Sequence, residues 1–252
     1  MKKLKKLYWL LLKKKKDIVL SLFGDRNYKK FVIISRSRTG STLLMALLNK
    51  HNNIICEGEL FKVLHGKSCR DIWDELYGKK PKRIKFIGFK LFYYHPFDDD
   101  KEVWDFIEND KDIAIIHLTR KHYLEAYLSQ KIGEKTKQWS ESKFRPHDIT
   151  LQDKVVRLDS KECKETFQKI NTYEKETMER FKNHEVIEVD YKDLNEDKEG
   201  IVSSIFTAFQ LPMEKVQVVN KKQNSESMSE LIENYQELKD EFANTEWSYL
   251  FE

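Results

Sequence analysis

The feature that most constrains the fold is a short apolar run, IAIIHL, at residues 113–118. A strand with water on one face alternates apolar and polar residues, whereas a near-continuous apolar strand is buried on both faces. Strands of the second kind occur in parallel sheets that helices cover on both sides. The run therefore predicts an α/β fold with a parallel sheet.

Strand and helix patterns alternate along the rest of the chain. Further short β-branched or aromatic runs predict strands at residues 31–35, 84–91 and 186–189. Apolar residues at helical spacing predict helices within residues 41–50, 124–132, 167–181, 201–209 and 228–238. This alternation predicts a three-layer fold, a central parallel sheet flanked by helices. In such sheets ligands bind at the carboxyl ends of the strands.

Length and composition favour one domain and a charge-balanced surface. The 252 residues fit a single core, since such cores stop growing near ~250 to 300 residues. We expect a basic N-terminal arm at residues 1–30 and one domain at residues 31–252. The 46 basic and 42 acidic side chains leave a net charge of only +4, which does not favour a nucleic-acid partner. Cys56, Cys69 and Cys163 form no CxxC pair, which suits reduced thiols in the cytoplasm.

The N-terminal arm is rich in lysine around a short apolar run at residues 7–12. That run is far shorter than the ~20 residues of a spanning helix, and also too short for a secretory signal. Basic residues alternating with leucine and aromatic residues suit an interfacial helix on an anionic membrane surface. A disordered arm or one that docks on the core is the alternative. We therefore expect a cytoplasmic protein, membrane-associated if the arm binds lipid.

The loop after the first predicted strand has the composition of an anion site. It lies in FVIISRSRTGSTLL, between a strand and a helix whose first backbone N–H groups attract phosphate. Gly40 lets the backbone approach the anion and Arg38 adds charge. Hydroxyl groups add further donors, from Thr39, Ser41 and Thr42. The alternative is that Ser41 simply caps the helix.

This loop differs from the nucleotide-kinase loop GxxxxGK[ST], because no lysine follows Gly40 and the basic residue, Arg38, stands two places before it. The arrangement resembles the PAPS-dependent sulfotransferases, which use 3′-phosphoadenosine 5′-phosphosulfate (PAPS) as donor. The resemblance implies a P-loop-like fold. It also implies that the donor's 5′-phosphosulfate binds to the residues of this loop, Arg38, Thr39, Gly40, Ser41 and Thr42.

A second segment, IIHLTRKHYLEAYLSQ, strengthens the resemblance. Arg120 follows the buried strand and Ser129 comes nine positions later on a predicted helix. The family holds the donor's 3′-phosphate with an arginine and a serine so placed, which assigns that role to Arg120 and Ser129. A bidentate guanidinium with a hydroxyl donor suits a phosphate monoester. Taken singly, Arg120 also fits a surface ion pair and Ser129 a helix surface.

Three further segments resemble the bacterial carbohydrate, nodulation-type, branch of the family. They are CEGELF, IGFKLFYYH and KKQNSESMSELIENYQEL. The resemblance implies a carbohydrate or glycolipid acceptor, with PAPS as co-substrate.

The resemblance also suggests the groups that carry the reaction. Sulfuryl transfer needs a base for the acceptor hydroxyl and cations for the leaving group. The branch places a glutamate at Glu59, which is our first choice for the base, with Glu57 as its rival. We expect Lys90 at a strand end, hydrogen-bonded to the transferring group. His95 is a second base candidate, although it stands five residues after Lys90 rather than in the KxH arrangement of the small-phenol enzymes. This scheme uses no metal.

Two other functions compete with sulfuryl transfer. One is a P-loop phosphoryl transferase that uses ATP or GTP, against which the missing GK[ST] counts. The other is a non-catalytic module that binds anions or nucleic acid, which the near-balanced charge makes weak.

Overall fold

The computed structural model describes residue 20 and residues 22–138, 149–214 and 226–252. Its centre is a five-stranded sheet with the order β2-β3-β1-β4-β5, in which all four pairs of neighbours are parallel. The strands are β1 (Lys29–Ser35), β2 (Ile54–Glu57), β3 (Phe86–Phe92), β4 (Ala114–Thr119) and β5 (Val186–Asp190). The predicted α/β fold with a parallel sheet is therefore confirmed.

The middle strands are apolar because helices cover both of their faces. All seven residues of β3 are buried, as are five of the six in β4. The central strand, β1, pairs with β3 on one side and with β4 on the other. The run IAIIHL thus lies next to the central strand, as a strand buried on both faces should.

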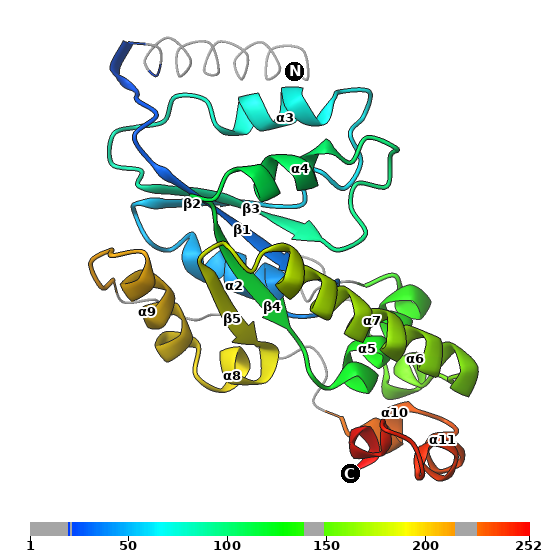
Figure 1. Cartoon of the computed structure of the whole chain (residues 1–252). Helices are drawn as coiled ribbons and strands as arrows, with labels where there is room; N and C mark the ends of the chain where they lie inside the picture. Colours follow the sequence, from blue (N-terminus) through cyan, green and yellow to red (C-terminus); the bar gives the residue numbers. More distant parts are fainter. Residues whose placement is uncertain (1–19, 21, 139–148, 215–225) are drawn as a thin grey trace, which may run out of the picture.

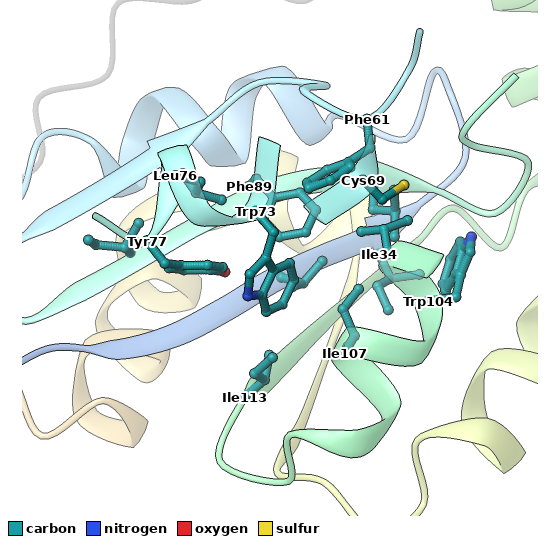
Figure 2. Packing of buried hydrophobic residues seen from close by; sticks show 14 of the residues in the cluster. Ile34, Phe61, Cys69, Trp73, Leu76, Tyr77, Phe89, Trp104, Ile107 and Ile113 are labelled. Atoms are coloured by element: carbon teal, nitrogen blue, oxygen red, sulfur yellow. The ribbon is translucent and has the colours of Figure 1, made fainter. Parts of the chain in front are cut away.

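Helices form the outer layers on the two faces of the sheet (Figure 1). On one face lie α2 (Ser41–Leu48), α8 (Tyr191–Glu196) and α9 (Lys198–Ala208), whose apolar residues share a core with β1 and β4. On the other lie α3 (Cys69–Leu76) and α4 (Glu102–Asn109). Figure 2 shows this second core, in which Trp73 of α3 packs edge-on to the ring of Phe89 of β3, with Ile107 of α4 in the same cluster.

A third core lies near the carboxyl end of β4, where the C-terminal residues pack against two long helices. These are α5 (Tyr123–Thr136) and α7 (Ser160–Arg180), with the short α6 (Leu151–Lys154) between them in sequence. They pack against α10 (Met228–Leu231), α11 (Tyr235–Phe242) and the 3-10 helix η1 (Ser248–Phe251). Figure 1 shows this C-terminal group beside α5, α6 and α7.

The single helix that we expected over residues 228–238 is wrong, because the chain leaves the helical conformation between α10 and α11. Ile232 is extended and forms a parallel bridge with Val156. Just beyond it, the buried Asn234 side chain accepts from the amide of Leu158 at 3.0 Å and donates to its carbonyl at 2.9 Å. These two bonds satisfy the backbone N–H and C=O of Leu158, which lie outside any helix or strand and need partners.

The N-terminal arm lies mostly outside the described residues, so its helix, its lipid contact and the division at residue 30 stay predictions. Within the described residues, no helix is long and apolar enough to span a membrane.

Candidate active site

The loop between β1 and α2 has a backbone that only a few residue types adopt readily. Arg38 and Gly40 both have positive φ, 68° and 82°. For arginine this region is uncommon and costs free energy, so the surroundings must hold it. The Thr39 hydroxyl donates to the carbonyl of Arg36 at 2.9 Å and ties the loop to the strand end. A strained, pinned loop of this kind is typical of a binding site.

Among the described residues, no side chain occupies the backbone N–H groups at the start of α2. The N-cap residue is Gly40, and no side-chain hydrogen bond caps the helix. The alternative that Ser41 is the cap is therefore wrong, since Ser41 is the first helical residue and is buried. The N–H groups at this end remain able to bind an anion.

Tyr191, the first residue of α8, packs over the loop and was missed in the sequence. A Cβ on Gly40 would lie 2.5 Å from its ring, so only glycine fits there. The guanidinium carbon of Arg120 lies 4.4 Å from the centre of the same ring. The sequence signal was an aromatic residue two positions after the predicted strand at residues 186–189. Tyr191 thus fixes both Gly40 and Arg120.

The structure brings the two predicted anion motifs into direct contact. Arg38 Nε donates to Ser129 Oγ at 2.9 Å, and Arg120 Nη1 donates to the carbonyl of Arg38 at 3.1 Å. Ser129 is buried on α5 rather than on the helix surface. Arg120 does form an ion pair, with Glu125 at 2.6 Å, but its side chain is largely buried and its Nε has no hydrogen-bond partner in the described part of the chain. The β1–α2 loop, the end of β4 and helix α5 therefore meet at one positively charged site.

A second group forms at the start of α2, around Lys90. Lys90 Nζ donates to Thr42 Oγ1 at 3.0 Å and lies 3.3 Å from Glu59 Oε1. Lys90 is buried within β3, where it pairs in register with Ile33 of β1. Glu59 follows β2, and its partly exposed carboxylate also lies 3.9 Å from Lys62. A cation and a carboxylate are thus held together at the helix start that follows the loop.

The other two base candidates lie in different surroundings. Glu57 ends β2 with an exposed side chain. His95 is buried beside the rings of Phe92, Tyr94 and Phe97. Burial, with the charges of nearby lysines, lowers the pKa of His95 to about 4. So low a pKa makes histidine a weak base at neutral pH. The geometry favours Glu59 for the proton-accepting role.

The cluster is positively charged and suits a polyanion. Burial lowers the pKa of Arg38, and the charge of Arg120 lowers it further. Guanidinium groups that repel one another in the free protein gain most from a ligand with several negative charges. Arginine with a hydroxyl or backbone donor also matches phosphate geometry. Among the described residues, no group of three or more histidine, cysteine and acidic side chains is arranged for a metal ion.

Substitution of Gly40 tests the contact with Tyr191. Gly40→Ala should lower the free energy of unfolding by more than Gly66→Ala, with an added cost of about 1 to 3 kcal/mol for the displaced ring. Gly66 is a matched control because its φ is also positive, 79°, while a Cβ there meets nothing within 4 Å. Urea denaturation of both variants gives the difference. Equal losses would show that the ring moves aside without cost.

The chain is similar in sequence to known proteins over most of its length. No protein-family model matches the chain. Nodulation protein H of Rhizobium tropici is 26% identical over 243 residues, covering 88% of this chain and 92% of that protein. Nodulation protein H of Rhizobium meliloti is 21% identical over 244 residues, covering 89% and 95% respectively.

Two solved structures are also similar. One is a sulfotransferase from Alicyclobacillus acidocaldarius, with 14% identity, a TM-score of 0.49 and coverage of 84% of this chain and 90% of its own. The other is mouse sulfotransferase SULT7A1 complexed with PAP, with 12% identity, a TM-score of 0.43 and coverage of 92% and 91%. The near full-length similarity to nodulation proteins H confirms the resemblance to the nodulation-type branch of the sulfotransferases, which the motifs predicted.

Proposed function

We propose that this protein transfers a sulfuryl group from PAPS to a hydroxyl of a carbohydrate or glycolipid. The observation that carries the proposal is the hydrogen bond from Arg38 to Ser129 beside Arg120. It joins the strand-to-helix loop to a second anion motif more than eighty residues away in sequence. A donor with a phosphosulfate at one end of its ribose and a phosphate at the other needs two such anion sites side by side.

The donor is held by two sets of groups. The 5′-phosphosulfate binds Arg38, the hydroxyls of Ser41 and Thr42, and the backbone N–H groups of the loop and the start of α2. Thr39 contributes its backbone N–H, because its hydroxyl donates to the carbonyl of Arg36. Arg120 and Ser129 bind the 3′-phosphate, which ATP lacks. The buried Arg120 Nε, which has no partner in the described residues, fits a role that a ligand completes. Tyr191 keeps the arginine in place through its ring.

The chemical step uses the group around Lys90. The acceptor hydroxyl oxygen forms a bond to sulfur while the bond from sulfur to the bridging phosphate oxygen breaks. Glu59 takes the proton of the hydroxyl, and the adenosine 3′,5′-bisphosphate (PAP) leaves. Lys90 stabilises negative charge that develops on the leaving oxygen, since it lies 3.0 Å from Thr42 Oγ1 at the start of α2. His95 and Glu57 are the alternative bases. Fixed cations supply the electrostatic stabilisation in this scheme, and no metal is needed.

The nature of the acceptor and the cellular place of the reaction rest on the sequence. The carbohydrate acceptor follows from the resemblance to the nodulation-type branch. A cytoplasmic enzyme whose basic N-terminal arm binds an anionic membrane surface would suit a glycolipid, and that arm lies mostly outside the described residues.

Transfer assays with two labelled donors test the function directly. PAPS carrying radioactive sulfur and ATP carrying radioactive γ-phosphate are each incubated with lipid extracts, oligosaccharides and phenols. We expect labelled product from PAPS and none from ATP, in the oligosaccharide or lipid fractions. Product from ATP alone would indicate a phosphoryl transferase. PAP binding without transfer from either donor would indicate a binding module.

The variant Glu59→Gln tests the base. It keeps the shape of the side chain but cannot accept a proton at neutral pH, so the single-turnover rate should fall by roughly 100- to 10,000-fold. PAP affinity should barely change. Glu57→Gln is the matched control, because it makes the same change two residues away on an exposed side chain.

Thermal melts of both variants exclude a loss of folded protein. If Glu57→Gln or His95→Ala loses the chemical step while Glu59→Gln keeps it, the base is that residue and Glu59 has another role.

A further inference from the structure

Arg36 is a buried arginine that neither the donor motifs nor the resemblance assigns. It is the first residue after β1 and is 7% exposed. Its Nη2 donates to the neutral amide oxygen of Gln130 on α5, at 2.9 Å. Its Nη1 is buried and, within the described residues, has no hydrogen-bond partner. A guanidinium that is buried with an unsatisfied nitrogen is costly unless a ligand completes its hydrogen bonds.

No ionised carboxylate compensates this charge at close range. Among the described residues, no acidic side chain lies within 4 Å of the Arg36 guanidinium. Glu174 on α7 carries the acidic group that raises the pKa of Arg36, and its carboxylate accepts from Tyr123 OH at 2.8 Å. Burial raises the pKa of Glu174 to about 7, so much of it is neutral at physiological pH. Burial also lowers the pKa of Arg36, which shows the cost of keeping that cation inside.

Arg36 lies two residues before the loop of the proposed donor site, residues 38–42, which we call the donor loop. The hydroxyl of Tyr94 accepts from the amide of Ser37 at 3.3 Å, and the Arg36 carbonyl accepts from the Thr39 hydroxyl of the loop at 2.9 Å. Arg36 is therefore tied to the start of the loop that carries Arg38. On its other side, Gln130 directly follows Ser129, which holds Arg38.

We infer that Arg36 is a third arginine of the donor site and that its guanidinium binds an oxyanion of the 5′-phosphosulfate. The inference rests on the proposed function, since PAPS is the ligand that it names. The charges fit, because the 3′-phosphate alone carries roughly two negative charges and the phosphosulfate adds more. Arg38 and Arg120 are the cations that the motifs assign, and Arg36 brings a further charge from the end of the central strand. The bound donor would supply the counter-charge that the buried guanidinium otherwise lacks.

The variant Arg36→Gln tests this through two nucleotides that differ only at the 5′ end. Its affinity for PAP should fall by about 10- to 100-fold, the loss expected for charge-assisted hydrogen bonds. Its affinity for adenosine 3′-monophosphate, which has no 5′-phosphate, should stay nearly unchanged. Isothermal titration calorimetry gives both dissociation constants. Equal losses for the two nucleotides, or no loss for PAP, would overturn the inference.

A structural arginine would give a different result. Arg36→Gln removes a buried charge that lacks a close counter-ion, so the melting temperature should not fall. A lower melting temperature with unchanged PAP affinity would mean that Arg36 only supports the fold. Arg157→Gln is the control, since Arg157 pairs with Glu233 and Glu237 on an exposed surface and should leave nucleotide binding unaltered. If Arg36→Gln does not fold, Arg36→Lys decides: weaker PAP binding supports the inference, and wild-type binding overturns it.

Failure of the proposed function can be told apart from failure of this inference. If the wild-type protein does not bind PAP, the proposed function fails, and inorganic sulfate then probes the loop alone. Sulfate binding that is lost in Arg36→Gln would keep Arg36 as an oxyanion ligand. Sulfate binding that is the same in both proteins, or absent from both, would overturn it. If the wild type binds PAP and Arg38→Ala loses it while Arg36→Gln does not, the function stands and the inference fails.

Discussion

The parallel pairing of β1 with both of its neighbours is the constraint on which the site depends. Because β3, β1 and β4 run in the same direction, their carboxyl ends meet at one edge of the sheet. The strained loop follows β1 there, Lys90 lies near the end of β3, and Arg120 follows β4. Residues that are far apart in sequence thus become neighbours, as the hydrogen bonds from Lys90 to Thr42 and from Arg38 to Ser129 show. A slip in either pairing would separate the loop from Lys90 or from Arg120.

The second constraint is electrostatic and makes the site costly without a ligand. Arg36, Arg38 and Arg120 gather at one strand edge, where Arg120 pairs with Glu125 and burial lowers the pKa values of Arg36 and Arg38. Like charges held together in a partly buried place oppose folding, and a polyanionic ligand reverses that opposition. The positive φ of Arg38 adds strain in the same loop. We infer that this cluster lowers the free energy of unfolding of the free protein. A bound donor would raise it again, because its negative charges offset those of the arginines.

The sequence predicted the elements whose pattern is local. The strand at residues 113–118 could be recognised because burial on both faces leaves a continuous apolar run. The loop of the proposed donor site could be recognised because its residue types stand in a fixed order between a strand and a helix. The break after α10 could not be predicted, since Ile232 leaves the helix to pair with Val156, a partner that no local pattern reveals. Tyr191 was missed for a similar reason. It acts on Gly40 only because β5 lies beside β4 in the sheet.

The central claim is that Arg120 and Ser129 turn a general anion loop into a site for a nucleotide with a 3′-phosphate. The most direct test is the ratio of two dissociation constants, those of PAP and adenosine 5′-monophosphate, measured for the wild type and for Ser129→Ala. The account predicts much tighter binding of PAP by the wild type, and a smaller ratio in the variant because only PAP loses a contact. Equal affinity of the wild-type protein for the two nucleotides would contradict it.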